Sequence, residues 1–149
     1  MTVFQPKDPA YESRVRASFA KQGLMQTLFA SLERVEPGSV EIALVPSAAV
    51  SQQHGFVHVG ALSTIADTAA GYAALTLLPP GVGILTAEFK INLLAPANGE
   101  RILARGRVIK AGRTLTLAQA EVFAAGQEKL VALLTATLMT IEGRAGIND

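Results

Sequence analysis

A long, alanine-rich and almost uncharged segment constrains this chain more than any other feature. The segment runs from Gly60 to Leu78 and reads GALSTIADTAAGYAALTLL, which as an α-helix would be about 28 Å long. Pro79 and Pro80 end it, because proline lacks the backbone N–H that a helix interior needs. A helix that is apolar on nearly every face must be surrounded by lipid or by protein. The fold therefore has to be built around this helix.

One carboxylate stands near the middle of the predicted helix. Asp67 is the only formally charged residue between Glu41 and Glu88. An aspartate at the centre of a bilayer costs a few kcal/mol, and the alanine, serine and threonine around it offset little of that cost, which argues against a transmembrane helix. A sheet curled around the helix meets the same requirement in water. Burial raises the pKa of a carboxyl group, so Asp67 is either a hydrogen-bonded structural residue or a functional one.

The segment before the long helix predicts an opening helix and a hairpin. Asp8 followed by Pro9 predicts the N-cap and first turn of an amphipathic helix, which Gly23 interrupts. Residues 28–35 and 39–45 are β-rich and are separated by a Glu-Pro-Gly turn, which fits a hairpin.

The segment after the long helix predicts an antiparallel meander. Its four strand-like runs are residues 84–94, 101–110, 114–123 and 129–141. Turn residues such as Asn98-Gly99 and Gly112 separate them. With the long helix inside, these strands predict an antiparallel sheet wrapped around one central helix.

Length and composition narrow the function classes. A chain of 149 residues predicts a single domain, residues 1–149. With 13 basic and 12 acidic residues, it has no bulk field to recruit nucleic acid or an anionic membrane. The lack of cysteine excludes disulfides, thiolate nucleophiles and zinc–thiolate sites, and with no signal-peptide core near the start it favours a cytoplasmic protein. Half the residues are apolar, which predicts that some apolar surface lies in a subunit interface.

A short motif precedes the long helix. Residues 52–60 read QQHGFVHVG, and Asp67 lies nine residues beyond His58. This segment resembles the PaaI-like branch of the hotdog thioesterases, whose pattern is an Asn, a Gly, then His-Gly-Gly, then an aspartate nine positions after the histidine. Gly55, His58, Gly60 and Asp67 match that pattern.

The resemblance extends over roughly residues 20–140, with two departures. Further matches are Thr86, Pro96, Gly99 and the pair Gly112-Arg113. Gln52 stands where the family has asparagine, and glutamine carries the same amide group on a longer side chain. Val59 stands where the family has the first glycine of His-Gly-Gly, and it keeps the backbone N–H but adds bulk beside it.

The resemblance implies both a fold and an activity. It implies an α+β hotdog fold, in which an antiparallel sheet wraps around one long central helix. It implies an acyl-CoA thioesterase that uses neither a metal nor a cofactor, with the CoA thioester as substrate. It also implies self-association as a homodimer or a dimer of dimers (homotetramer).

The helix start and the lone aspartate are the candidate catalytic groups. A helix N-terminus offers unpaired N–H groups, and the Val59 N–H is the candidate donor to a thioester oxyanion, although an ordinary helix start is the alternative. Asp67 would act as general base or nucleophile, with Gln52 and Thr86 positioning the reacting groups. His58 either polarises the carbonyl or braces the loop. The predicted substrate-binding residues are Gly60, Phe56 and Arg113.

Spacing along the helix predicts that two chains build each site. Val59 and Asp67 are eight residues apart, which is about 12 Å along a helix axis. General base or nucleophilic chemistry needs the carboxylate within about 3 Å of its target, directly or through one water. An isologous pair of antiparallel helices would therefore create two composite sites.

The sequence leaves open where CoA and the acyl group bind, and whether the protein hydrolyses or only binds acyl-CoA. The basic residues of 101–113 would suit CoA phosphates or would simply form a solvated outer strand face. A pocket walled by Phe56, Leu62 and Phe89 would suit aryl or medium-chain acyl groups. A non-catalytic acyl-CoA binding module is the main functional alternative, since Gln52 and Val59 could preserve binding and slow hydrolysis. Hotdog dehydratases and hydratases carry other motifs and are a weaker functional alternative.

Overall fold

The computed structural model describes residues 3–124, 126 and 129–149. Its helices are α1 (Tyr11–Phe19), α2 (Gly23–Thr27), the short 3-10 helix η1 (Ala48–Val50) and α3 (Val59–Leu75). Its strands are β1 (Ser31–Glu36), β2 (Ser39–Leu44), β3 (Gly83–Leu93), β4 (Ile102–Ala111), β5 (Leu115–Ala124) and β6 (Lys129–Ile141).

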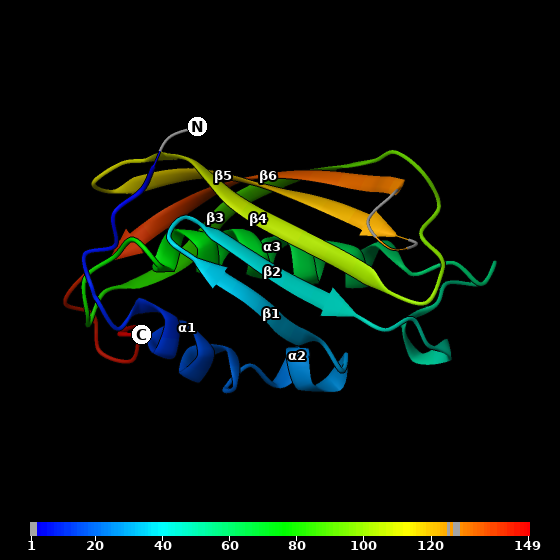
Figure 1. The fold of residues 1–149 in the computed structure, drawn as a ribbon, viewed down its shortest axis with the longest axis horizontal. Helices are drawn as coiled ribbons and strands as arrows, with labels where there is room; N and C mark the ends of the chain where they lie inside the picture. Colours follow the sequence, from blue (N-terminus) through cyan, green and yellow to red (C-terminus); the bar gives the residue numbers. More distant parts are fainter. Residues whose placement is uncertain (1–2, 125, 127–128) are drawn as a thin grey trace.

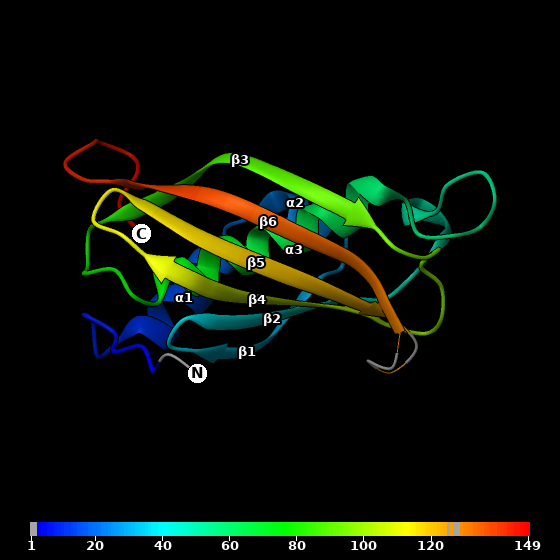
Figure 2. The same ribbon diagram turned by 90° about the horizontal axis from the view of Figure 1, so that it is seen from above.

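The six strands form one antiparallel sheet in the order β1-β2-β4-β5-β6-β3 (Figure 2). The predicted four-strand meander is therefore wrong at β3, which pairs with β6 at one edge while β4 pairs with β2. A tight turn joins β4 to β5, whereas the longer segment 94–101 connects β3 to β4. A connection of that length lets the chain pass the positions of β6 and β5 instead of forming a hairpin.

The sheet curls around α3, which lies across its concave face with α1 and α2 below (Figure 1). The sheet-facing side of α3 is mostly alanine, with Ile65 and Ala69 fully buried. These small side chains let the helix approach closely: a Cβ at Gly106 of β4 would overlap the backbone of Ala69 and lie 2.6 Å from Ala70 N. The predicted α+β hotdog arrangement is confirmed. None of the helices among the described residues is long and apolar enough to span a membrane.

The long helix ends three residues earlier than predicted, at Leu75. Thr76 follows it and is fully buried, where its hydroxyl donates to Ala73 O at 2.6 Å and accepts from Gly38 N–H at 2.8 Å. The Arg14 guanidinium of α1 donates to Leu75 O at 2.9 Å. The Thr76 hydroxyl thus supplies Ala73 O with the donor that Leu77 N–H would have been in a longer helix.

The opening elements also begin later than predicted. Helix α1 starts at Tyr11 with Ala10 as its N-cap residue, and the Asp8 carboxylate before it accepts from Ala10 N–H at 2.8 Å and pairs with Arg14. Strand β1 starts at Ser31 rather than residue 28. Helix α2 occupies the chain up to Thr27, and Phe29 then takes a positive φ of 52° that breaks any extended run.

Replacing Gly106 with alanine tests the close contact between α3 and β4. The added Cβ must push the helix away from the sheet, so we expect Gly106→Ala to lower the free energy of unfolding by about 1–3 kcal/mol. Gly71→Ala is the matched control, because a Cβ there meets nothing within 4 Å and alanine favours a helix. Urea unfolding of both variants measures the difference. Equal stability of the two variants would contradict the proposed contact.

Candidate active site

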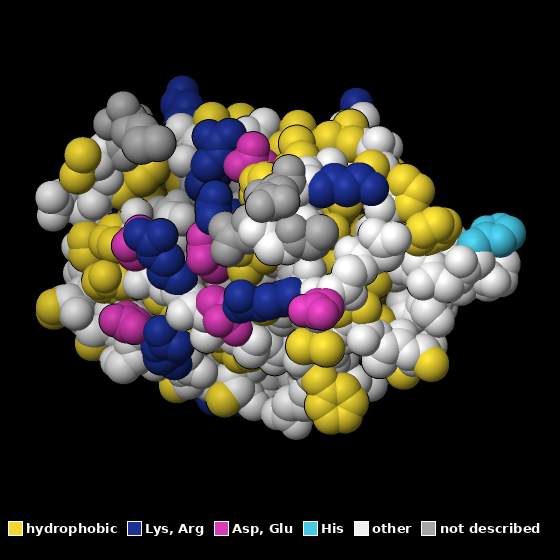
Figure 3. All heavy atoms as spheres, turned by 45° about the vertical axis from the view of Figure 1, so that its right-hand side comes forward, with side chains coloured by type: hydrophobic (Ala, Val, Ile, Leu, Met, Phe, Trp, Pro, Cys, Tyr) yellow, Lys and Arg dark blue, Asp and Glu magenta, His cyan; other side chains and the backbone are white. Residues whose placement is uncertain are grey.

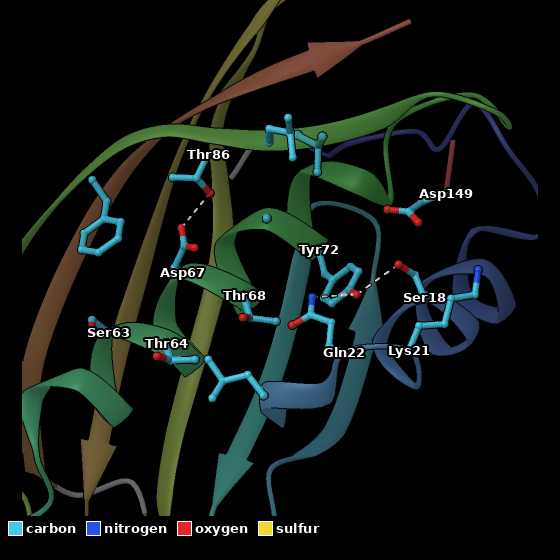
Figure 4. A pocket seen from close by; sticks show the side chains of 15 residues that line it. Ser18, Lys21, Gln22, Ser63, Thr64, Asp67, Thr68, Tyr72, Thr86 and Asp149 are labelled. Carbon is cyan, nitrogen blue, oxygen red and sulfur yellow. Dashed lines mark hydrogen bonds between the residues drawn. The ribbon is translucent and has the colours of Figure 1, made fainter. Parts of the chain in front are cut away.

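Asp67 lies on the one side of α3 that the sheet leaves open. That side faces a cavity of about 660 Å³ between α3, β3 and the α1–α2 segment (Figure 4). The residues that α3 gives to this cavity are small or polar, namely Ser63, Thr64, Asp67, Thr68, Gly71 and Tyr72. Within one chain the helix is therefore not enclosed on this side, where a row of hydroxyl and carboxylate groups lines the cavity.

Thr86 of β3 orients the Asp67 carboxylate. The Thr86 hydroxyl donates to Asp67 Oδ1 at 2.8 Å, while Oδ2 receives no hydrogen bond from any described residue. Burial raises the pKa of Asp67, and the hydrogen bond from Thr86, which favours the charged form, acts in the opposite direction. A half-buried carboxylate with one oxygen free is suited to accept a proton or attack a carbonyl carbon.

The start of α3 presents one unused backbone N–H. His58 is the N-cap residue, and its ring Nδ1 accepts from Gly60 N–H at 2.8 Å. Ala61 and Leu62 both donate their N–H to His58 O. Within the described part of the chain, the Val59 N–H has no hydrogen-bond partner and is free to donate to a ligand.

His58 makes side-chain and backbone hydrogen bonds at the helix start. With Nδ1 as the acceptor, the ring carries its proton on Nε2, which remains a donor. The His58 backbone N–H donates to Val50 O at 2.8 Å, and the adjacent Val57 N–H donates to Ala97 O at 2.9 Å. The loop is therefore held at both sides, which fixes where the helix begins. Both alternatives for His58 stay compatible with this geometry.

A second cavity, of about 560 Å³, lies at this helix start. Gln52, Phe56, His58 and Val59 line it, together with Leu62 and the segment 93–97. The Gln52 side-chain oxygen accepts from the His54 N–H within its own loop, which leaves the amide NH₂ as the group available to a ligand. The lining is otherwise largely apolar.

Within one chain, the predicted site residues fall into two separate sets. Asp67, Thr86 and Phe89 line the first cavity, whereas Gln52, Phe56, His58, Val59 and Leu62 line the second. Within one chain, Phe56 and Leu62 therefore lie apart from Phe89, and the acyl pocket expected from these three residues stays a prediction for a site that two chains share. Gly60 and the exposed Arg113, in the β4–β5 turn, line neither cavity.

The basic cluster lies on the outer face of the sheet, away from both cavities. Arg101 pairs with Glu33 at 2.7 Å and Arg105 pairs with Glu41 at 2.6 Å, so acidic residues of β1 and β2 face the arginines of the β4 segment. Figure 3 shows basic and acidic side chains next to one another on one face of the molecule. This arrangement favours the solvated outer face over a CoA phosphate site.

Sequence reasoning missed a polar cluster at the far end of the first cavity. Tyr72 Oη accepts from Gln22 Nε2 at 2.9 Å and lies 3.1 Å from Ser18 Oγ. These residues come from α3, the α1–α2 junction and α1, so no local pattern links them. Across the described ranges, no three His, Cys, Asp or Glu side chains lie close enough to hold a metal ion.

Comparisons with known proteins agree on one family. Residues 54–131 match the model of the Thioesterase superfamily. A thioesterase family protein of Silicibacter pomeroyi is 47% identical, with a TM-score of 0.86 over 89% of this chain and 99% of that one. A thioesterase of Haemophilus influenzae is 19% identical, with a TM-score of 0.83 over 97% of this chain and 99% of that one. The Escherichia coli PaaI protein from the phenylacetic acid degradation operon is 22% identical, with a TM-score of 0.81 over 89% of this chain and 94% of that one. The last two share the fold.

The pH dependence of stability tests the environment of Asp67. Because the folded state raises the pKa of this carboxyl above its unfolded value, its charged form opposes folding once the pH exceeds that range. Asp67→Asn keeps the shape and can still accept from Thr86, so we expect it to be more stable than wild type at pH 7. The gain should shrink as the pH falls toward 4 and the wild-type carboxyl is protonated. Urea unfolding at a series of pH values measures this, and a difference that does not change with pH would refute it.

Proposed function

Because the chain belongs to the thioesterase superfamily and is a thioester hydrolase, we propose that its substrate is an acyl-CoA, hydrolysed at sites that two copies of the chain share. One observation carries this proposal. The free oxygen of Asp67 and the free N–H of Val59 open into different cavities of one chain. Hydrolysis needs both groups at one thioester, so a second chain supplies the missing one.

The edge of the sheet supports pairing with a second chain. Strand β3 is an edge strand, and its exposed side chains include Leu85, Phe89 and Leu93. A long edge strand with large apolar side chains is a surface that proteins cover. Because Thr86 and Phe89 of β3 also line the Asp67 cavity, a twofold contact along this edge would bring the partner's helix start toward Asp67.

In the composite site, each group has a defined task. The Val59 N–H of one chain donates to the thioester oxygen as negative charge develops there. Asp67 of the other chain acts through its free oxygen, while Thr86 holds the carboxylate. Acting as a base, Asp67 takes a proton from water as the water oxygen attacks the carbonyl carbon and the CoA thiolate leaves. Acting as a nucleophile, Asp67 attacks the carbonyl carbon and the CoA thiolate leaves, which gives a mixed acyl anhydride that water then hydrolyses to the free acid and the Asp67 carboxylate.

The remaining predicted residues act around these two groups. The Gln52 amide NH₂ and His58 Nε2–H are donors at the helix start, where they would orient the thioester or the attacking water. No cofactor takes part, and CoA enters as part of the substrate. The rival function, an acyl-CoA binding module without catalysis, would need neither the free Asp67 oxygen nor the free Val59 N–H.

Removing the Asp67 carboxylate tests the activity. Thiol release is measured with a panel of aliphatic and aryl acyl-CoAs. We expect Asp67→Ala and Asp67→Asn to lower kcat by roughly 10²–10⁴-fold while acyl-CoA still binds, because each loses the base or nucleophile. If wild type binds acyl-CoA but its turnover does not depend on Asp67, the protein is the binding module instead.

Proline at position 59 tests the oxyanion donor without disturbing the helix. Val59 is the first residue of α3, a position that proline favours, and the extended φ and ψ of His58 (−63° and 140°) suit a residue before proline. Apart from the change of side chain, for which Val59→Ala is the control, Val59→Pro removes an N–H that makes no bond within the described residues. We expect kcat to fall roughly 10²–10³-fold with the fold intact, whereas Val59→Ala, which keeps the N–H, should stay close to wild type.

Mixing two inactive variants tests the sharing between chains. In a mixed dimer of Val59→Pro and Asp67→Asn chains, one composite site combines both defects and the other has neither. After random reassociation, we expect about a quarter of wild-type activity, since half of the dimers are mixed and each has one intact site. No recovery after subunit exchange, shown by mass spectrometry to have occurred, would place both groups of each site in one chain.

A further inference from the structure

The connection between β3 and β4 carries a chemically labile dipeptide. Asn98 is followed by Gly99, and the sequence contains no other Asn-Gly pair. Both residues are exposed and lie in the irregular segment 94–101. The other two asparagines, Asn92 and Asn148, are followed by residues that carry side chains. Asparagine is one of the thermolabile residues that heat-adapted proteins use sparingly, and an exposed loop gives it the most freedom to react.

Nothing in the described part of the chain holds the two reacting groups in place. The Asn98 side-chain amide makes no hydrogen bond to any described residue, and the Gly99 N–H has no acceptor among them. Gly99 takes a φ of 112°, which residues with a side chain rarely adopt. Because glycine has no Cβ, its backbone nitrogen is also open to approach from the preceding side chain. The Gly99 nitrogen is therefore both unpaired and unshielded.

These two groups can react with each other without a catalyst. The Gly99 nitrogen attacks Asn98 Cγ, a C–N bond forms, and the side-chain nitrogen leaves as ammonia. The resulting cyclic succinimide then takes up water at one of its two carbonyl carbons. Attack at Cγ breaks the new C–N bond and leaves aspartate. Attack at the main-chain carbonyl carbon breaks the original peptide bond instead and leaves isoaspartate, whose main chain runs through Cβ and Cγ and is one atom longer.

A longer main chain matters here because the preceding residue, Ala97, holds the loop that leads into α3. Ala97 is 2% exposed, and its carbonyl oxygen accepts from Val57 N–H at 2.9 Å. Val57 directly precedes His58, the N-cap residue of α3. Figure 2 shows the β3–β4 connection at the end of the sheet where the chain enters this helix. The Ala97–Val57 hydrogen bond thus ties the modified segment to the helix start.

The two products should differ in their effect on the cavity at the helix start. Pro96 and Ala97 line that cavity together with Val57 and Val59. An extra main-chain atom directly after Ala97 must displace this wall or break the hydrogen bond to Val57. Aspartate at position 98 leaves the main chain as it was and adds one charge to an exposed side chain. Only isoaspartate should therefore disturb the site.

We propose that Asn98 is a site of spontaneous covalent modification, at which succinimide formation with Gly99 and hydrolysis to isoaspartate gradually disable the start of α3. Water is the only co-reactant, and ammonia is released. The modification itself does not depend on what the protein hydrolyses. Its effect on activity rests on the proposed function, in which the Val59 N–H stabilises the oxyanion.

Peptide mapping of stored protein tests the modification. Samples kept at neutral and at mildly alkaline pH are digested, and mass spectrometry identifies succinimide, aspartate and isoaspartate at each asparagine. We expect conversion of Asn98 through the succinimide, faster at alkaline pH because the attacking nitrogen must lose its proton. Asn148 is the internal control, since it is also exposed but precedes Asp149, whose side chain crowds the attacking nitrogen. An unmodified Asn98, or one that reacts no faster than Asn148, would overturn the proposal.

Variants at position 98 connect the modification to activity. We expect wild-type acyl-CoA hydrolysis to fall in proportion to the isoaspartate fraction, with kcat of the converted chains lowered roughly tenfold or more, as for a small displacement of a catalytic group. Asn98→Asp copies the harmless product and should start close to wild-type activity. Asn98→Gln keeps the amide on a side chain too long for succinimide formation, so its activity should persist during storage. If Asn98→Gln loses activity as fast as wild type, the loss has another cause and the proposal fails.

Hydrogen exchange followed by NMR locates the damage. The Val57 amide should exchange faster in the isoaspartate form than in fresh protein, whereas Ala120 within β5 should stay equally protected. Treatment with a protein-isoaspartate methyltransferase and S-adenosylmethionine, which returns isoaspartate to aspartate, should restore both Val57 protection and activity. An isoaspartate form with full activity and full Val57 protection would overturn the proposed effect. Wild type that hydrolyses no acyl-CoA would instead defeat the proposed function, while the mapping and exchange results would still decide this inference.

Discussion

The contact between α3 and the sheet sets the layout of the whole molecule. The backbone of Ala69 rests on β4 at Gly106 with no space for a side chain between them. Close packing of this kind commits one side of the helix to alanine and small aliphatic residues. Functional groups can then occupy only the opposite side and the exposed helix start. Asp67 and Val59 occupy these two places.

Helix α3 fixes where the Val59 N–H and the Asp67 carboxylate lie, and the surroundings of α3 set their hydrogen bonding and charge. The rise of about 1.5 Å per residue keeps the Val59 N–H and the Asp67 carboxylate apart in any single chain. At the start of α3, the His58 ring takes up the Gly60 N–H, which leaves the Val59 N–H as the donor. At the middle, burial opposes the charge on Asp67 while the Thr86 hydroxyl stabilises it. In the proposed site, both groups would therefore be in place before a substrate binds.

The sequence predicted features that depend on local patterns. A lone charge in an alanine-rich segment singled out Asp67 as the candidate, and the run beginning at Gly60 placed the start of α3 within one residue of Val59. The strand order was predicted wrongly, because which edges pair depends on the path of the 94–101 connection and not on any single strand. The Ser18 and Tyr72 cluster was missed altogether, because its members are 54 residues apart and lie in different helices. Contacts of this kind are decided by the packing of elements, which no local pattern encodes.

The Asp67 cavity has two walls of different origin. The helix with its aspartate and the β3 strand belong to residues 54–131, the stretch that the chain shares with its superfamily. The opposite wall comes from residues 18–24, outside that stretch. Substitutions in the opening helices can therefore reshape one end of the cavity while the proposed catalytic groups keep their geometry. A fold divided in this way can acquire a different substrate preference while its reaction stays the same.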